Sequence, residues 1–368
     1  ITTAAGTTSG DITLNGAVTG VGYVTINAGS TSSGNTGDVA INANITAADA
    51  NGVIGIDIDA TNDVTVAGTL TTSDGGTALD IDIDAGNEFT LSSGGIDSDN
   101  DIFITASAND VNLAAGLTAD NEVTILSTSG SVLQTAGNIL ATNDVNIDAA
   151  ATSQKIDLAG TIGATTAIGG SVLIGQAVGT SDIEIDGAIT ANGSVVVDGT
   201  TITATANISS DANTDATGDV DLGATGAISQ TGGTINANNG FAKIVSSGST
   251  VSLVDVDSAG ANTQSTEITT NGITDNGGVA IQIQGSGDVT VGGIDATNAA
   301  GNVEIKSASN IVLNDVDGGT TTGTVYLEAG DSITDGNGDT VNASADNLNL
   351  VATNDATLNS NVATLDFS

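Results

Sequence analysis

The sequence predicts an all-β fold, a single-stranded parallel β-helix (β-solenoid) with about 22 residues and three short strands in each coil. Three observations support this prediction. They are a repeat of constant length, an alternation of apolar and polar residues inside the repeat, and turn-forming residues at a fixed place in it. We therefore expect one elongated solenoid domain that takes in residues 1–368.

The repeat is clearest between Val279 and Ala356. One apolar marker recurs there at steps of 22, 22 and 23 residues, at Ile281, Val303, Val325 and Leu348. A second apolar marker keeps the same steps, at Val289, Ile311, Ile333 and Ala356. A period of roughly 20–50 residues is typical of solenoids, propellers and arrays. Two independent markers with one period indicate that successive repeats form successive coils.

Each repeat contains two runs in which apolar residues occupy alternate positions, as in Val64-Thr65-Val66. A period of two predicts a strand with one buried face. A third, weaker run reads Gly-x-Leu or Gly-x-Ile, as at Gly68-Thr69-Leu70. The pattern predicts that six marker residues point into the core: Val64, Val111, Val145, Val220, Val289 and Ile311.

Asparagine recurs two residues before the strand markers, at Asn62, Asn87, Asn109, Asn121 and Asn143. Glycine and asparagine accept a positive φ more readily than other residues, so we expect a left-handed backbone where the coil bends at these positions. Stacked asparagines can also hydrogen-bond to their equivalents one coil along. The spacing therefore predicts polar ladders along the turns.

The period is interrupted between Ser258 and Gly278. Ile244 and Ile281 are separated by 37 residues, which is well above the usual spacing. We interpret this stretch as an irregular insertion near residues 258–278 within the solenoid.

The chain is strongly acidic, with 44 Asp and Glu residues, 3 Lys and no Arg or His, for a net charge of −41. Nucleic-acid binding depends on Lys and Arg that neutralise phosphates, so we expect none. No run approaches the roughly 20 apolar residues that cross a bilayer, so we expect no membrane insertion. The chain begins at Ile1 and contains no Met, which favours a processed product or an excerpt of a longer chain.

Two rows of aspartates form the candidate metal site. If the repeat of Ile56 stacks on that of Ile81, Asp57 lies over Asp82 and Asp59 lies over Asp84. Neighbouring coils are ~4.8 Å apart, and like charges at that distance disfavour each other unless a cation or a proton intervenes. Calcium prefers oxygen ligands. We expect no required cofactor, with Ca²⁺ as the candidate ligand of these aspartates and a solvated acidic face as the alternative.

Segments such as NDVTVAGTL, NEVTILSTSGSVLQTAGNI and GDVTVGGIDATNAAGNVEI resemble the repeat regions of large bacterial surface proteins. These are filamentous-haemagglutinin-type adhesins and autotransporter passenger domains. The resemblance covers nearly the whole chain and lies in composition and periodicity. It implies a secreted, right-handed β-helix on a bacterial or archaeal cell surface, with a structural or adhesive role. The implied partner is the surface of a host or neighbouring cell, or a polysaccharide.

The two ends of the chain, ITTAAGTTSGDITL and NSNVATLDFS, read as ordinary coil sequence without a helical or proline-containing cap. Uncapped solenoid ends expose unpaired strand edges. We therefore expect either end-to-end association of copies into a filament or continuation in a longer chain.

We expect a non-enzymatic protein, with a carbohydrate-active β-helix as the alternative function. Enzymes that resemble pectate lyase use an arginine, and this chain has none. Glycoside hydrolysis needs two carboxylates at a defined separation, and sugar rings need aromatic platforms, but only 2% of the residues are aromatic. A localised groove with carboxylates and aromatic residues would favour the carbohydrate function, and evenly spread polar rows would favour the structural one.

Overall fold

The computed structural model of the chain describes residues 10–29, 36–48, 54–73, 78–163, 169–176, 181–210, 218–238, 240–258, 279–296, 302–318, 323–338 and 340–367. These residues form strands and turns, and no helix occurs among them. The chain divides into two compact units, Ile1–Glu184 (unit 1) and Ile185–Ser368 (unit 2). A single elongated domain over both units stays a prediction.

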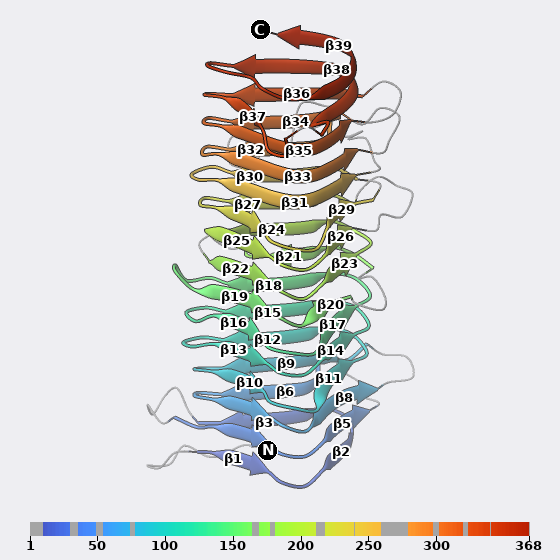
Figure 1. The fold of residues 1–368 in the computed structure, drawn as a ribbon. Coiled ribbons are helices and arrows are strands. Elements are labelled where there is room, and N and C mark those ends of the chain that lie inside the picture. Colours follow the sequence, from blue (N-terminus) through green and yellow to red (C-terminus); the bar gives the residue numbers. More distant parts are fainter. Residues whose placement is uncertain are drawn as a thin grey trace. The chain divides into compact units, whose positions relative to one another are not determined.

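Unit 1 is built from three columns of parallel strands, and each strand pairs with its equivalent in the next coil (Figure 1). The first column contains β3 (Val24–Ala28), β6 (Ile54–Ala60), β9 (Asp80–Ala85), β12 (Ile102–Ala106), β15 (Val123–Ser127), β18 (Val145–Ala149) and β21 (Val172–Ile174). The second contains β1 (Ile12–Leu14), β4 (Val39–Ile41), β7 (Val64–Val66), β10 (Phe89–Leu91), β13 (Val111–Leu113), β16 (Val132–Gln134) and β19 (Lys155–Leu158). The third contains β2 (Val18–Val21), β5 (Ile45–Ala48), β8 (Thr69–Ser73), β11 (Gly95–Ser98), β14 (Leu117–Ala119), β17 (Asn138–Ala141) and β20 (Thr161–Ile162).

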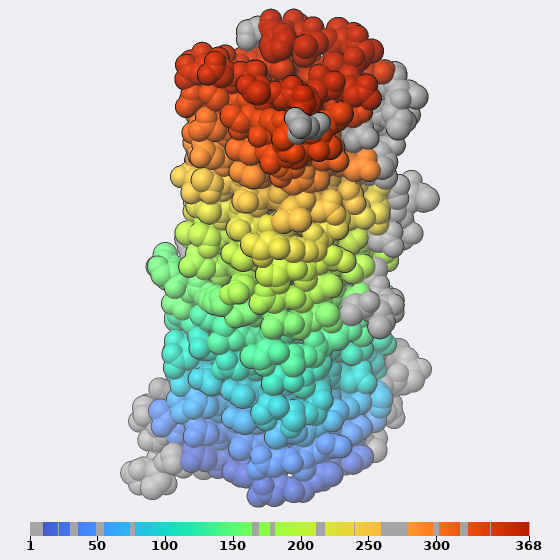
Figure 2. Space-filling model, viewed as in Figure 1, coloured from blue at the N-terminus to red at the C-terminus, as the bar shows by residue number. Residues whose placement is uncertain are grey.

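The strand register in unit 1 confirms the predicted parallel β-helix. In the first column, Ile81, Ile102, Val123 and Val145 are partners in successive coils, at steps of 21, 21 and 22 residues. The second column keeps a similar spacing. Phe89, Val111 and Val132 pair there in the same way. Each coil therefore stacks in register on the one before, and in Figure 2 the colours of this unit follow one another in bands.

The chain passes from unit 1 to unit 2 within β22 (Asp182–Ile185). Unit 2 begins with strands of the same three kinds, which are β23 (Ile189–Ala191), β24 (Val195–Gly199), β25 (Thr201–Ala204), β26 (Ile208–Ser210), β27 (Val220–Ala224), β28 (Ile228–Gln230) and β29 (Ile235–Ala237). Its later strands are β30 (Ala242–Ser246), β31 (Val251–Ser258), β32 (Val279–Gly285), β33 (Val289–Ala296), β34 (Asn302–Ser307), β35 (Ile311–Gly318), β36 (Thr324–Ala329), β37 (Ile333–Asp335), β38 (Ala343–Ala352) and β39 (Ser360–Phe367). β31 pairs with both β28 and β29, so one long strand replaces the second and third strands in the coils of β31, β33 and β35. β35 in turn pairs with both β37 and β38, where the two strands are separate again.

The register of unit 2 also follows the sequence markers. Ile281, Val303, Val325 and Leu348 are partners in successive coils, and so are Val289, Ile311, Ile333 and Ala356. The assignment of Ile244 as the equivalent of Ile281 in the preceding coil was wrong. Ile281 pairs with Ala242, and Ile244 pairs with Ile283. The predicted insertion near residues 258–278 begins at the last residue of β31, Ser258, and its residues 259–278 lie outside the described residues.

The core of each unit is a narrow stack of aliphatic side chains. All six residues predicted to point inward have 0% exposure, namely Val64, Val111, Val145, Val220, Val289 and Ile311. In the short strands β4, β7, β10, β13 and β16 of the second column in unit 1, buried residues flank a half-buried central one. This alternation confirms that the period of two marks strands with one face in the core.

The turns differ from the prediction in their backbone. None of the five predicted asparagines has a positive φ; Ser153 is the one non-glycine residue with a positive φ among the described residues. The left-handed residues are instead mostly glycines at several turns, among them Gly94 and Gly137 between the second and third strands, with φ of 80° and 89°. A Cβ on Gly94 would lie 2.2 Å from the carbonyl oxygen of Gly68 one coil below, so only glycine fits.

Candidate functional site

The four predicted metal ligands lie on two neighbouring strands of unit 1, β6 and β9. Asp57 pairs with Asp82, and Asp59 pairs with Asp84. The residues between them on each strand are buried, so the four carboxylates point outward. Asp84 is exposed and the other three are half-buried. The structure thus brings together the two rows of like charges that the sequence predicted.

Asp57, Asp59 and Asp82 each have a pKa above the ordinary aspartate value. Burial, followed by the charges of Asp84 and Asp57, raises the pKa of Asp82 to about 6. Burial and the charge of Asp84 also raise the pKa of Asp57, and burial with the charges of Asp57 and Asp84 raises that of Asp59. Removing water from a carboxylate and placing a second one beside it both disfavour the charged form. Proton uptake is therefore one way in which this face relieves its repulsion.

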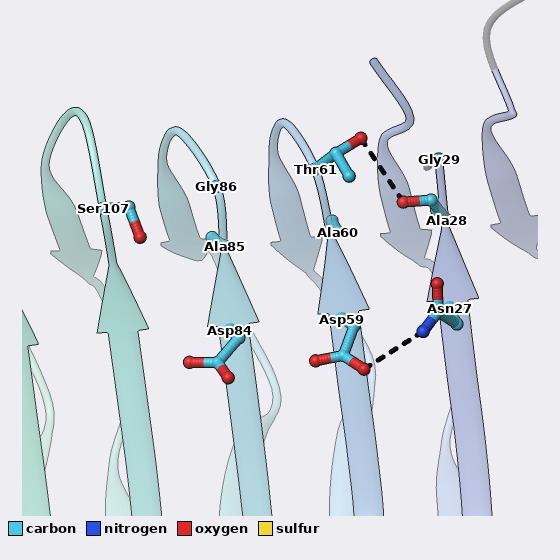
Figure 3. Close-up of a pocket in the computed structure, with 10 residues that line it drawn as sticks. All are labelled: Asn27, Ala28, Gly29, Asp59, Ala60, Thr61, Asp84, Ala85, Gly86 and Ser107. Atoms are coloured by element: carbon cyan, nitrogen blue, oxygen red, sulfur yellow. Dashed lines mark hydrogen bonds between the residues drawn. The ribbon is translucent and has the colours of Figure 1, made fainter. Parts of the chain in front are cut away.

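The row of Asp59 and Asp84 continues at Asn27 on β3 and borders a cavity of about 620 Å³ (Figure 3). Asn27 Nδ2 donates a hydrogen bond to Asp59 Oδ2 at 3.1 Å. The rest of the lining is small, chiefly alanine and glycine at the strand ends, with the hydroxyls of Thr61 and Ser107. The cavity is polar and has no aromatic residue in its described lining, so it lacks a platform for a ring-shaped ligand.

The described residues contain no group of three acidic side chains placed to hold a metal ion. The four aspartates form two parallel rows along the stack, and each row brings two carboxylates close together. A Ca²⁺ ion there would bridge the carboxylates of two coils and offset their repulsion. Calcium binding at Asp57, Asp59, Asp82 and Asp84 stays a prediction.

The predicted asparagines form ladders along the turns. In two places the contact joins equivalent amides: Asn109 Nδ2 donates to Asn87 Oδ1 at 2.7 Å, and Asn143 Nδ2 donates to Asn121 Oδ1 at 2.5 Å. The backbone follows the same direction, because the N–H of Asn109 donates to the carbonyl oxygen of Asn87 at 2.9 Å. Each rung links one coil to the next coil along the chain.

In other rungs the acceptor is an acidic residue that sequence reasoning missed. Asp101 Oδ1 accepts from Asn121 Nδ2 at 2.6 Å and from the N–H of Glu122 at 2.9 Å. Asp63 Oδ1 accepts in the same way from Asn87 Nδ2, at 2.6 Å, and from the next backbone N–H. Asn62 Nδ2 donates likewise to Asp38 Oδ1, at 2.7 Å. Part of the signal was present in the sequence, because Asp63 directly follows Asn62 and Asp101 directly follows Asn100, whereas Asp38 follows a glycine.

The same turn contact occurs in unit 2 at Asp288. Its carboxylate accepts from Ser309 Oγ at 2.6 Å and from the backbone and side-chain nitrogens of Asn310, each at 3.1 Å. These hydrogen bonds, led by that of Ser309, lower the pKa of Asp288. A carboxylate that accepts several hydrogen bonds is stabilised in its charged form. Part of the large negative charge therefore serves to join coils.

The fold and its turn contacts define the chain as a parallel β-solenoid repeat protein. No protein family, curated protein or solved structure matches the chain. Among the described residues, no helix has the length and apolar character needed to span a bilayer. The structure thus confirms that the chain is a β-helix repeat protein. Its assignment to the adhesin or autotransporter type is a proposal.

Proposed function

We propose that this chain is a non-enzymatic, extracellular protein with a structural and adhesive role on a bacterial or archaeal cell surface. In this proposal it is a segment or subunit of a long β-solenoid fibre, of the filamentous-haemagglutinin or autotransporter-passenger type. Support comes from the stacked coils and from the polar ladders spread along their turns. The composition agrees, since Ser-His-Asp and Cys-His catalysis need residues that the sequence does not contain.

The observation that carries the proposal lies at β39, which among the described strands pairs with β38 alone. Leu365 of β39 lies opposite Leu348, which is fully buried, yet Leu365 is 46% exposed. Phe367 lies opposite Leu350 and is 62% exposed, although Leu350 is buried. An unpaired strand edge with exposed apolar side chains favours the addition of another strand. A further coil, from a longer chain or from another copy, would bury both residues.

The association state of the chain in solution tests the fibre. We expect linear assemblies that grow with protein concentration, because a head-to-tail contact between identical subunits does not close. Leu365→Asp should shift the assemblies toward monomer by placing a charge on the exposed edge. Val254→Asp is the matched control, since Val254 is also 46% exposed but lies on β31. Light scattering and electron microscopy measure the assemblies of the native chain and of the two variants. A native chain that stays a stable, monodisperse monomer would overturn the non-covalent fibre.

The cell-surface location is tested separately. An antibody raised against the folded chain should label intact cells that produce the protein, without permeabilisation. Labelling that requires permeabilised cells would contradict the extracellular location and leave the result of the association experiment unchanged.

A further inference from the structure

A groove of about 490 Å³ lies on the outward face of unit 2, near the end of the described chain. It is formed by β34, β36 and β38, where Glu304, Tyr326 and Asn349 are partners across neighbouring strands. Lys306 and Asn302 of β34 also line it. A volume of this size is within the roughly 300–1,000 Å³ of small-molecule sites. The groove therefore combines a carboxylate, an ammonium group, two amides and an aromatic ring.

The charged side chains of the groove hold one another in place. Glu304 is only 4% exposed, forms an ion pair with Lys306, and accepts a hydrogen bond from Gln282 Nε2 at 3.2 Å. Tyr326 Oη donates to Glu328 Oε2 at 3.1 Å, and Lys306 Nζ lies 3.9 Å from the same oxygen. A buried carboxylate is retained only when it is paired and hydrogen-bonded. These contacts fix the direction of the polar groups before any ligand arrives.

Tyr326 distinguishes this groove from two other hollows among the described residues. It is half-buried, and Lys306 Nζ lies 5.4 Å from the centre of its ring. A second hollow of about 510 Å³ adjoins the groove at Lys306 and includes Glu328. Neither this hollow nor the 620 Å³ cavity of unit 1 has an aromatic residue in its described lining. Tyr326 thus supplies a ring in a groove that shares Lys306 with a neighbouring hollow.

A buried glutamine lies beside the groove, in the same row as Glu304. Gln282 is 2% exposed, and its Oε1 finds no hydrogen-bond donor among the described residues. It lies directly below Glu304 in the same row of outward-facing positions. A buried acceptor without a donor costs about 1–3 kcal/mol. An unsatisfied buried acceptor calls for an explanation, such as a water molecule or a bound ligand that supplies the donor.

We propose that this groove binds a neutral saccharide. The C–H face of a sugar ring packs on the face of Tyr326, which carries partial negative charge. Sugar hydroxyls both donate and accept, which suits the carboxylates of Glu304 and Glu328 as acceptors and the amides and ammonium as donors. Two carboxylates against one lysine leave the site negative, and the chain carries a net charge of −41. Anionic saccharides are therefore repelled.

The inference names a ligand class for the adhesive role and in that respect rests on the proposed function. The binding itself is a property of the isolated chain, whatever its location. Absence of saccharide binding in a chain that forms linear assemblies would overturn the groove and leave the fibre. Saccharide binding by a chain that stays a monodisperse monomer would support the groove and overturn the non-covalent fibre.

The chain offers a direct probe, because it contains two tyrosines and no tryptophan. Tyr23 of unit 1 is 71% exposed, so Tyr23→Phe leaves Tyr326 as the sole tyrosine emitter. Neutral gluco-, galacto- and manno-hexasaccharides are titrated into this variant. We expect a saturable change in tyrosine emission with at least one of them, and no change with an oligogalacturonate of the same length.

Calorimetry with the responding saccharide locates the site. Tyr326→Val, a residue suited to strands, should weaken Kd about tenfold or more, while Tyr326→Phe keeps the ring and most of the affinity. Tyr23→Val is the matched control and should bind as the native chain does. Circular dichroism establishes that each variant is folded; if Tyr326→Val is not, Lys306→Gln is measured instead, with the same expected loss. Binding that is unchanged in these groove variants, or no saccharide binding below about 10 mM, would overturn the proposal.

Discussion

Individual aspartates have opposite effects on the stability of the fold. The effect depends on whether the carboxylate accepts hydrogen bonds or lies beside other carboxylates. Asp288 accepts hydrogen bonds from the next coil and has a lowered pKa. Asp82 lies in a row of carboxylates and is half-buried, and its pKa is raised to about 6. The net charge of −41 is therefore a sum of stabilising and destabilising contributions.

The raised pKa of Asp82 predicts that unit 1 gains stability as the pH falls. The folded state binds this proton more tightly than the unfolded chain, whose ordinary aspartate value is 3.8. The contribution is complete below about pH 3.8 and is lost as the pH rises through about 6. Asp82→Asn should therefore raise the free energy of unfolding at about pH 7 by about 1 kcal/mol, a value discounted because the side chain is only half-buried.

Denaturant unfolding at a series of pH values measures this effect. The control is Asp97→Asn, which removes a charge from an exposed position on β11. Relative to the native chain, Asp82→Asn should gain more free energy of unfolding than Asp97→Asn at about pH 7. This difference should shrink as the pH falls to about 4, because Asp82 is then protonated in the folded native chain. Equal stabilities of the two variants at every pH would contradict a special environment at Asp82.

Calcium is predicted to act on the same rows. A divalent cation between Asp57 and Asp82, or between Asp59 and Asp84, offsets the repulsion that otherwise favours proton uptake. Added Ca²⁺ should raise the Tm more than Na⁺ does at equal ionic strength, and the excess should be smaller at about pH 5 and in Asp82→Asn. Equal responses to the two ions would reduce the effect to screening.

At the scale of the strand and turn, acids that directly precede some strands, such as Asp38, Asp63 and Asp101, connect neighbouring coils. Asp101 accepts from Asn121 Nδ2 and from the N–H of Glu122. Asp101→Ala leaves both donors without this acceptor and should lower the free energy of unfolding by about 1–3 kcal/mol. Chemical denaturation followed by circular dichroism measures the loss. Asp97→Ala, a change of the same kind four residues away at an exposed position, should have little effect.

The sequence predicted those parts of the strands and turns that depend on spacing. The markers Ile281, Val303, Val325 and Leu348 are partners because each repeat supplies one inward residue at a constant interval. Ile244 was taken as the marker in place of Ala242, two residues earlier, since both are apolar and both are buried. Alternation alone cannot choose between two inward residues of the same strand.

Other features depend on contacts that alternation does not encode. Lys243 and Glu304 occupy outward-facing positions in their strands, yet both are buried, at 1% and 4% exposure. Burial of an outward-facing residue is decided by what lies against that face, which a period of two does not describe. Likewise, the need for glycine at Gly94 comes from the backbone of the neighbouring coil and is visible only in three dimensions.

At the scale of the whole molecule, net charge opposes the proposed fibre, in which another coil would add to the exposed edge of β39. Each added subunit brings a charge of −41, and repulsion between like-charged subunits weakens association. Assembly should therefore increase with ionic strength, because salt screens charges that are separated by more than about 8–10 Å. Light scattering across a salt series, with the Leu365 and Val254 variants in parallel, measures this. Assembly that weakens as salt rises would contradict an apolar contact at β39.

Coils of nearly equal length can substitute for one another while the chain folds. Ile81, Ile102, Val123 and Val145 follow one another in unit 1 at 21, 21 and 22 residues, with similar apolar residues in each coil. A folding chain that skips one repeat therefore meets an edge almost as complementary as the correct one, with the skipped repeat looped out. Such slipped stacks are kinetic traps, since their correction requires whole coils to detach. Refolding of this unit should show a slow phase that diminishes when one coil is made unlike its neighbours.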